Sequence, residues 1–183
     1  HVAKNKELYL ENYWMKNKRS IAEGVDGPIN AWVIPAGQRR KADAADAINE
    51  LMRQGLEIHR ATNAFKAGNV SVAAGDFVVR GDQPYRTLAE MYFSIQNYPP
   101  QNPRPYDDTG WTFPEGFGVQ SIRVLDPKVL DAPMEAVSGP VRAVSGVQGT
   151  GSVFAINHNG DNGLITLRYR MPAANIQMAE APF

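Results

Sequence analysis

The feature that most constrains the fold is a strand–helix–strand pattern between residues 31 and 60. Residues 31–35 (AWVIP) are an apolar run, residues 41–54 place Ala44, Ile48 and Leu51 on one helical face, and residues 57–60 form a second short strand. Gly55 follows the last periodic residue, which is typical of a helix end. Tight joints of this kind are typical of a βαβ unit with a right-handed crossover. The pattern therefore predicts a mostly parallel sheet.

The plan of residues 31–65 recurs at 152–183. The second copy predicts strands at 153–156 and 175–179 around a helix at 161–170, and both copies close on a phenylalanine, Phe65 or Phe183. In the first copy a hairpin follows, with strands at 70–72 and 77–80 joined by AAGD. The second copy stops where that hairpin is expected, so the repeat predicts that the chain ends inside a domain. The alternative is that any two α/β units share such a plan.

Residues 4–23 predict a helix that ends at Gly24. The side chains expected to share one face are Leu10, Tyr13, Trp14, Asn17 and Ile21. Two interpretations are open, because this helix either packs on its own domain or is the last helix of a preceding one. We expect residues 1–24 to be the tail of a preceding domain and residues 25–183 to be an α/β domain. A further helix is predicted at 83–96, and residues 116–126 are either a helix or a strand.

Composition excludes several classes of function. The chain has 19 basic and 19 acidic side chains, so no global field attracts nucleic acid. It has no apolar run long enough to span a bilayer, and we expect no membrane span. It contains no cysteine, which excludes disulfides and thiolate chemistry. Its 43% hydrophobic content is that of a globular protein.

No believable metal or phosphate site can be assembled from the sequence. His59 has no ligand partner at helical spacing, and His158 lies in a polar turn, NHNGDNG, that lacks the glycine and glutamate of an EF-hand. The glycine-rich stretch at 146–152 precedes a predicted strand and lacks the Gly-Lys-Ser/Thr of a P-loop. We expect no catalytic residues, no metal and no cofactor in this chain.

The proline-rich segment 98–114 is unusually long for a loop, which favours packing or binding. Candidate binding residues in it are Tyr106, Asp107, Asp108, Thr109 and Trp111. Carboxylates, a hydroxyl and aromatic rings between prolines are suited to a binding edge. The favoured interpretation is structural, with Trp111 and Phe113 anchoring the loop while Asp107 bonds to turn amides.

Five segments in this order resemble the region downstream of the catalytic domain in bacterial zinc carboxypeptidases of the carboxypeptidase A-like family. They are VIPAGQ (33–38), EIHRA (57–61), AGDFVV (74–79), QPYR (83–86) and PYDDTGWTFP (105–114). The resemblance implies a flavodoxin-like accessory domain in a secreted or periplasmic hydrolase. It also implies that zinc and peptide hydrolysis belong to a preceding peptidase domain, which would pack against this segment.

Three hypotheses follow. The first is a noncatalytic accessory segment of a zinc carboxypeptidase-like protein. The second is a stand-alone α/β module that binds a small molecule or peptide through residues 98–114. The third is a degenerate enzyme that kept its fold and lost its site. Whether any activity resides in this chain is left undecided, because the family's zinc ligands and general base are absent from it.

Overall fold

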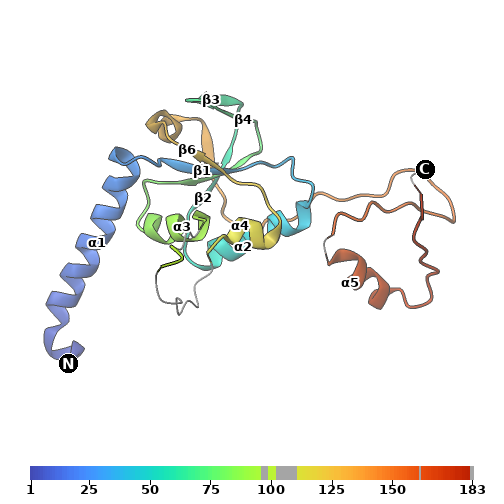
Figure 1. Ribbon diagram of the computed structural model, residues 1–183, viewed down its shortest axis with the longest axis horizontal. Coiled ribbons are helices and arrows are strands. Elements are labelled where there is room, and N and C mark those ends of the chain that lie inside the picture. The colour runs from blue at the N-terminus through green and yellow to red at the C-terminus, as the bar shows by residue number, and fades with distance from the viewer. Residues whose placement is uncertain (96–98, 102–110, 161, 182–183) are drawn as a thin grey trace. The chain divides into compact units, whose positions relative to one another are not determined.

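The computed structural model describes residues 1–95, 99–101, 111–160 and 162–181 (Figure 1). The chain divides into two compact units, His1–Ala143 and Val144–Phe183. The first unit carries a five-stranded sheet with helices and a small two-stranded ribbon, and the second carries one helix in the part that is described. The predicted boundary between residues 24 and 25 stays a prediction.

The main sheet is antiparallel, so the predicted mostly parallel, flavodoxin-like sheet is wrong. Its strands are β1 (Ala31–Ile34), β2 (Ile58–Ala61), β5 (Phe77–Arg80), β6 (Ile122–Val124) and β7 (Met134–Ala136). They lie in the order β6-β1-β5-β2-β7, and every neighbouring pair is antiparallel. The two strands of the predicted βαβ unit do exist, but β5 lies between them.

Helix width explains this insertion. Helix α2 (Lys41–Arg53) joins β1 to β2, and it confirms the helix predicted at 41–54. A helix with its side chains is about 10–12 Å wide, roughly twice the spacing of neighbouring strands, so a crossover easily leaves room for one strand. Val79 of β5 pairs with Trp32 on one side and with Ile58 on the other. The result is a split βαβ unit, in which β1 and β2 run in the same direction without touching.

The predicted hairpin between residues 70–72 and 77–80 is also wrong. Strand β4 (Val70–Val72) pairs with β3 (Phe65–Ala67) in a separate ribbon, across a tight turn in which Gly68 has a φ of 58°. The Asp76 carboxylate accepts hydrogen bonds of 2.8 Å from the amides of Ala73 and Ala36. These bonds hold the AAGD segment in a turn that sends the chain back into the main sheet rather than along β4.

Side chains alternate along the strands and build a core on each face of the sheet. One face packs Trp32, Ile34 and Val79 beneath α2, α3 (Arg86–Phe93) and α4 (Phe113–Phe117). The other face packs residues such as Val33 and Val78 beneath the ribbon and the 3₁₀ helix η2 (Pro127–Asp131). Helix α3 is shorter than the helix predicted at 83–96. The segment 116–126, for which the sequence leaves helix and strand open, contains the end of α4 and all of β6.

The second unit does not repeat the first. Its described part contains helix α5 (Gly163–Arg170), close to the predicted 161–170, but residues 153–156 and 175–179 form no strands. None of its described residues is buried. A strand needs neighbours to satisfy its amide and carbonyl groups, and no second strand lies beside these two segments within the described part of the unit.

The N-terminal helix is longer than predicted. A 3₁₀ turn, η1 (Val2–Asn5), leads into α1 (Lys6–Asp26), and Gly24 lies inside the helix rather than after it. The helix ends at Gly27, whose amide donates to the Glu23 carbonyl at 2.9 Å. Ser20 and Gly24 are the buried residues of α1, and both lie near its C-terminal end, where the helix meets the sheet (Figure 1).

Candidate functional site

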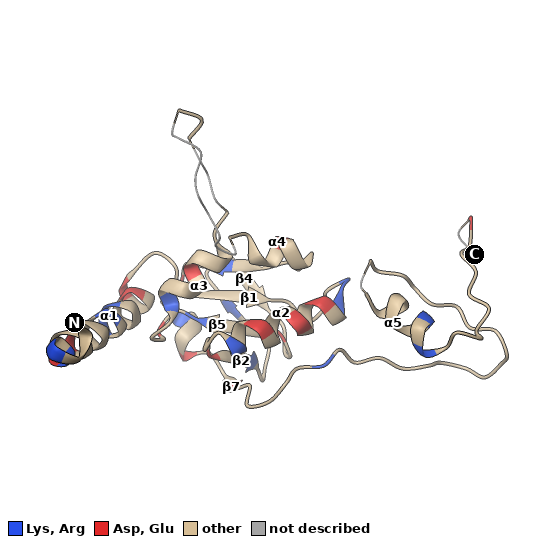
Figure 2. Ribbon diagram, turned by 90° about the horizontal axis from the view of Figure 1, so that it is seen from below, with Lys and Arg blue, Asp and Glu red and all other residues tan. Residues whose placement is uncertain are grey.

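Helix α1 leaves large apolar side chains in solvent along most of its length. Leu10 is 66% exposed, Trp14 60% and Tyr13 57%. In Figure 2 the blue and red positions of charged residues on the α1 ribbon alternate with tan positions of other residues. Single exposed apolar residues are common on protein surfaces, whereas several on one helix are typical of interaction sites.

Four exposed apolar residues of α1 lie along one side of the helix and form what we call the α1 stripe: Leu10, Trp14, Ile21 and Val25. At about 100° per residue, the four side chains fall within an arc of about 60° on the helix. The Lys18 ammonium lies 5.0 Å from the centre of the Trp14 ring, so a cation borders the stripe. Three of the four residues follow from sequence periodicity. Val25 does not follow from the sequence, because the sequence predicts that the helix ends at Gly24.

A second cluster surrounds His59 on β2. The Arg80 guanidinium forms two hydrogen bonds to the Asp82 carboxylate, of 2.8 and 2.6 Å, and a third to the Leu130 carbonyl at 2.8 Å. The hydrogen bond from Arg80 lowers the pKa of the Asp82 carboxyl. Burial, and then the positive charge of Arg80, lower the pKa of the His59 imidazole. His59 is therefore held neutral near pH 7, with its Nδ1 shielded from solvent and without a partner.

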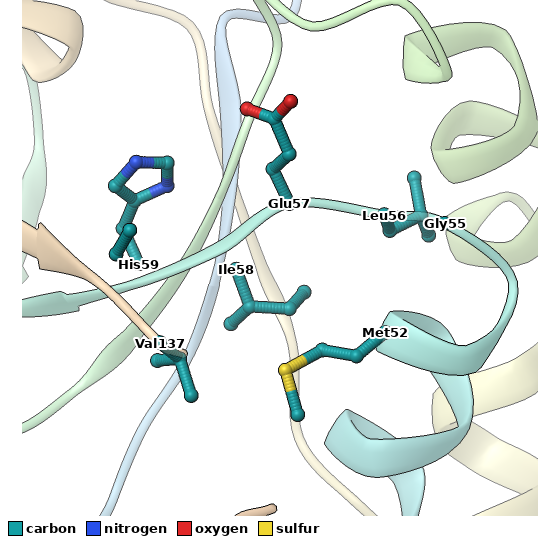
Figure 3. Close-up of a pocket in the computed structure, with 8 residues that line it drawn as sticks. Met52, Gly55, Leu56, Glu57, Ile58, His59 and Val137 are labelled. Atoms are coloured by element: carbon teal, nitrogen blue, oxygen red, sulfur yellow. The ribbon is translucent and has the colours of Figure 1, made fainter. Parts of the chain in front are cut away.

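A depression of about 300 Å³ adjoins this cluster and is lined by eight residues of α2, β2, β7 and their flanks. Its apolar side chains include Met52, Ile58 and Val137. Figure 3 shows Glu57 and His59 on the opposite side of β2 from Ile58 and Met52, as strand alternation requires. The polar groups thus do not converge on the apolar floor, and this arrangement does not resemble a ligand pocket.

Of the predicted binding residues, Tyr106, Asp107, Asp108 and Thr109 lie outside the described residues, and Trp111 lies within them. Trp111 is half-buried, and its indole nitrogen is shielded from solvent without a hydrogen-bond partner. The two ends of the loop meet beside it, because the Thr112 amide donates to the Ser94 carbonyl at 3.1 Å.

Aromatic rings follow directly after Trp111. The centre of the Phe113 ring lies 5.3 Å from the centre of the Tyr92 ring of α3 and 4.7 Å from that of Phe117. Phe113 thus contacts the main core, as expected for a residue that anchors the loop. The proposed binding edge and the anchoring role of Trp111 both stay predictions.

Metal chemistry finds no site in the described part of the chain. Among those residues, no three His, Asp or Glu side chains gather closely enough to hold an ion. His158 lies exposed in its polar turn, and His59 lies near enough to Arg80 and Asp82 for their charges to affect its pKa. No helix within the described ranges is both long and apolar enough to cross a membrane.

Comparison with known proteins identified no relatives. No protein-family model, no curated protein and no solved structure matches this chain.

Proposed function

We propose that this chain is a noncatalytic accessory segment of a zinc metallocarboxypeptidase-like protein, and that the α1 stripe packs against the zinc peptidase domain. The observation that carries the proposal is the exposure of Leu10, Trp14, Ile21 and Val25 on one face of a helix whose C-terminal end contacts the rest of its unit through Ser20 and Gly24. The partner and a secreted or periplasmic location come from the sequence resemblance alone.

Physical chemistry supports a packing role for the stripe. Burial of apolar surface contributes about 25 cal/mol per Å², and a buried indole removes roughly 150–250 Å² from water. Trp14 is 60% exposed, so about three fifths of that area is available to a partner, and its burial would contribute about 2–4 kcal/mol before the entropy of ordering is subtracted. Aromatic anchors of this kind dominate the binding energy of protein interfaces.

The test uses the full chain and a purified zinc domain from a carboxypeptidase of the resembled family. Trp14 is 60% exposed and Trp32 is fully buried, so acrylamide quenching of tryptophan fluorescence reports mainly on Trp14 and on whatever remains accessible of Trp111. We expect saturable one-to-one binding that protects Trp14 from the quencher. An unchanged quenching curve at high concentrations of the zinc domain would reject the proposal.

A matched pair of variants locates the surface. Leu10 and Leu8 are 66% and 65% exposed, and they lie on opposite sides of α1 because they are two residues apart. We expect Leu10→Glu to weaken binding at least tenfold, which corresponds to about 1.4 kcal/mol. Leu8→Glu introduces the same charge on the same helix and should leave binding unchanged. Equal losses in both variants would contradict a role for the α1 stripe.

A further inference from the structure

The junction between α1 and the sheet is built around two glycines in direct contact. A Cβ atom at Gly24 would overlap the carbonyl oxygen of Gly81, which directly follows β5. A Cβ at Gly81 would in turn overlap the carbonyl of Asn30 and approach the Cα of Gly24 to 3.2 Å. Gly24 has ordinary helical geometry, so the absence of a side chain serves close packing rather than an unusual turn.

Asn30 ties the end of the helix to the strands. Its side-chain amide donates to the carbonyls of Gly24 and Val25, at 3.0 and 3.1 Å, and so satisfies groups that a helix end leaves without partners. Its backbone amide donates to Val124 of β6 at 2.9 Å, and its carbonyl accepts from the Gly81 amide at 2.7 Å. This 1% exposed residue therefore belongs to the helix cap and to the sheet at once.

Two further contacts, nearer the N-terminus of α1, join the helix to Thr87 of α3 and to Tyr85. The Ser20 hydroxyl lies 3.3 Å from the Thr87 hydroxyl and accepts a hydrogen bond of 3.3 Å from the Thr87 amide in α3. About two turns earlier in the helix, the Tyr13 hydroxyl lies 3.4 Å from that of Tyr85. Contacts at three levels of one helix restrain its direction as well as its end.

We propose that this junction is a rigid mount, which holds α1 at a fixed angle to the sheet before any partner binds. The residues that form it are Gly24, Asn30, Gly81 and Ser20. The α1 stripe would then be presented in a preformed orientation. On binding a partner, a fixed helix would lose less conformational entropy than a hinged helix would. Only the purpose of the rigid mount, which is to present the α1 stripe to a partner, rests on the proposed function. Its own geometry can be tested without any partner.

The experiment measures a distance across the junction. Because the chain contains no cysteine, Glu11→Cys on α1 and Asp46→Cys on α2 provide two exposed and unique sites for spin labels. Pulsed electron paramagnetic resonance on the doubly labelled full chain should give one narrow distance distribution. A broad distribution in this parent protein would overturn the rigid mount.

Two variants of α1, each with one added atom, distinguish the effect of the rigid mount from a general effect on the helix. Gly24→Ala adds one carbon inside the contact, and Ala22→Ser adds one oxygen on the exposed side of the same turn. Replacement of a glycine by alanine in a free helix is stabilising by about 1 kcal/mol, so helix propensity predicts no loosening. We expect Gly24→Ala to broaden the distribution and Ala22→Ser to leave it narrow. An unchanged distribution in Gly24→Ala, or equal broadening in both, contradicts the proposal.

A milder variant covers the case in which Gly24→Ala disturbs folding. Ser20→Ala removes the contact to Thr87 and adds no volume, so it should broaden the distribution without loss of the near-ultraviolet signal of buried Trp32. A narrow distribution in Ser20→Ala together with an unfolded Gly24→Ala would show that the helix needs no lock at Ser20 and would count against the mount. Because no zinc domain is present, a failure here is distinct from a failure to bind one.

Discussion

The two regions that share a sequence plan, 31–65 and 152–183, reach opposite structural outcomes. The first becomes β1, α2 and β2 in a sheet with a core on each face, and the second yields only α5 in its described part. Ile48 of the first helix is 0% exposed, whereas Ile165 of the second is 58% exposed. Local pattern is similar in both, so long-range partners decide which copy forms a sheet.

The difference lies in what each segment can pair with. Strand β1 has β5 and β6 on its two sides, and every one of its residues is buried. The segment 153–156 has no neighbouring strand in the described part of its unit, and Val153 is 89% exposed. A helix satisfies its own backbone hydrogen bonds, whereas a strand must find them elsewhere in the chain.

The largest expected effect compares the two isoleucines directly. Ile48→Ala should lower the free energy of unfolding of the first unit by about 3 kcal/mol, because it leaves a cavity in a closed core. Ile165→Ala should change it by less than about 0.5 kcal/mol, as is usual for surface substitutions. Urea denaturation, followed by the near-ultraviolet signal of buried Trp32, measures the change in unfolding free energy for both variants. Equal losses would contradict the exposure of Ile165 and the contrast between the two helices.

Trp111→Ala should have the next largest effect. Its half-buried ring stands at the neck where Ser94 and Thr112 meet, so we expect a loss of about 2 kcal/mol in unfolding free energy. Chemical denaturation of the two proteins provides the measurement. An unchanged midpoint would remove the anchoring role and favour the alternative of a small-molecule or peptide-binding module.

A smaller effect is expected from pH at His59. Its pKa is lowered in the folded state, so the unfolded chain binds a proton first as pH falls. This contribution to stability is complete above about pH 6.5 and decreases as pH falls below that value toward the lowered pKa. The urea concentration at the unfolding midpoint should therefore decrease as the pH is lowered from 7 to 5. The decrease should be less steep in His59→Gln. Parallel curves for the two proteins would assign the pH dependence to other groups.

The smallest expected effect is that of zinc, which should be none. Three histidines without cysteine, separated in the sequence, do not supply the three ligands of a catalytic site. We expect the chain to retain less than stoichiometric zinc after dialysis and to cleave no peptide, as measured by elemental analysis and a carboxypeptidase assay. Stoichiometric zinc, with activity lost on chelation, would place the chemistry in this chain.

The candidate site was less accessible to sequence reasoning than the helices were. The α1 stripe follows in large part from helical periodicity, which by itself places Leu10, Trp14 and Ile21 on one face. The Arg80–Asp82 pair and the contact of Gly24 with Gly81 depend on the sheet, and no local period predicts them. Sequence alone predicts a helix end at Gly24, because glycine occurs both at helix ends and at close contacts, and only its surroundings distinguish the two.

Local sequence patterns are sufficient to predict the helices α1, α2 and α5 and the apolar faces of β1 and β2, because hydrophobic periodicity and capping act within a few residues. Three features depend instead on contacts between distant parts of the chain: β5 separates β1 from β2, β4 pairs with β3, and 153–156 forms no strand. Strand pairing joins residues far apart in the chain, and a short apolar run fits several neighbours equally well. The competition among those neighbours is settled by the whole fold, since each strand is stable only where its backbone groups find partners.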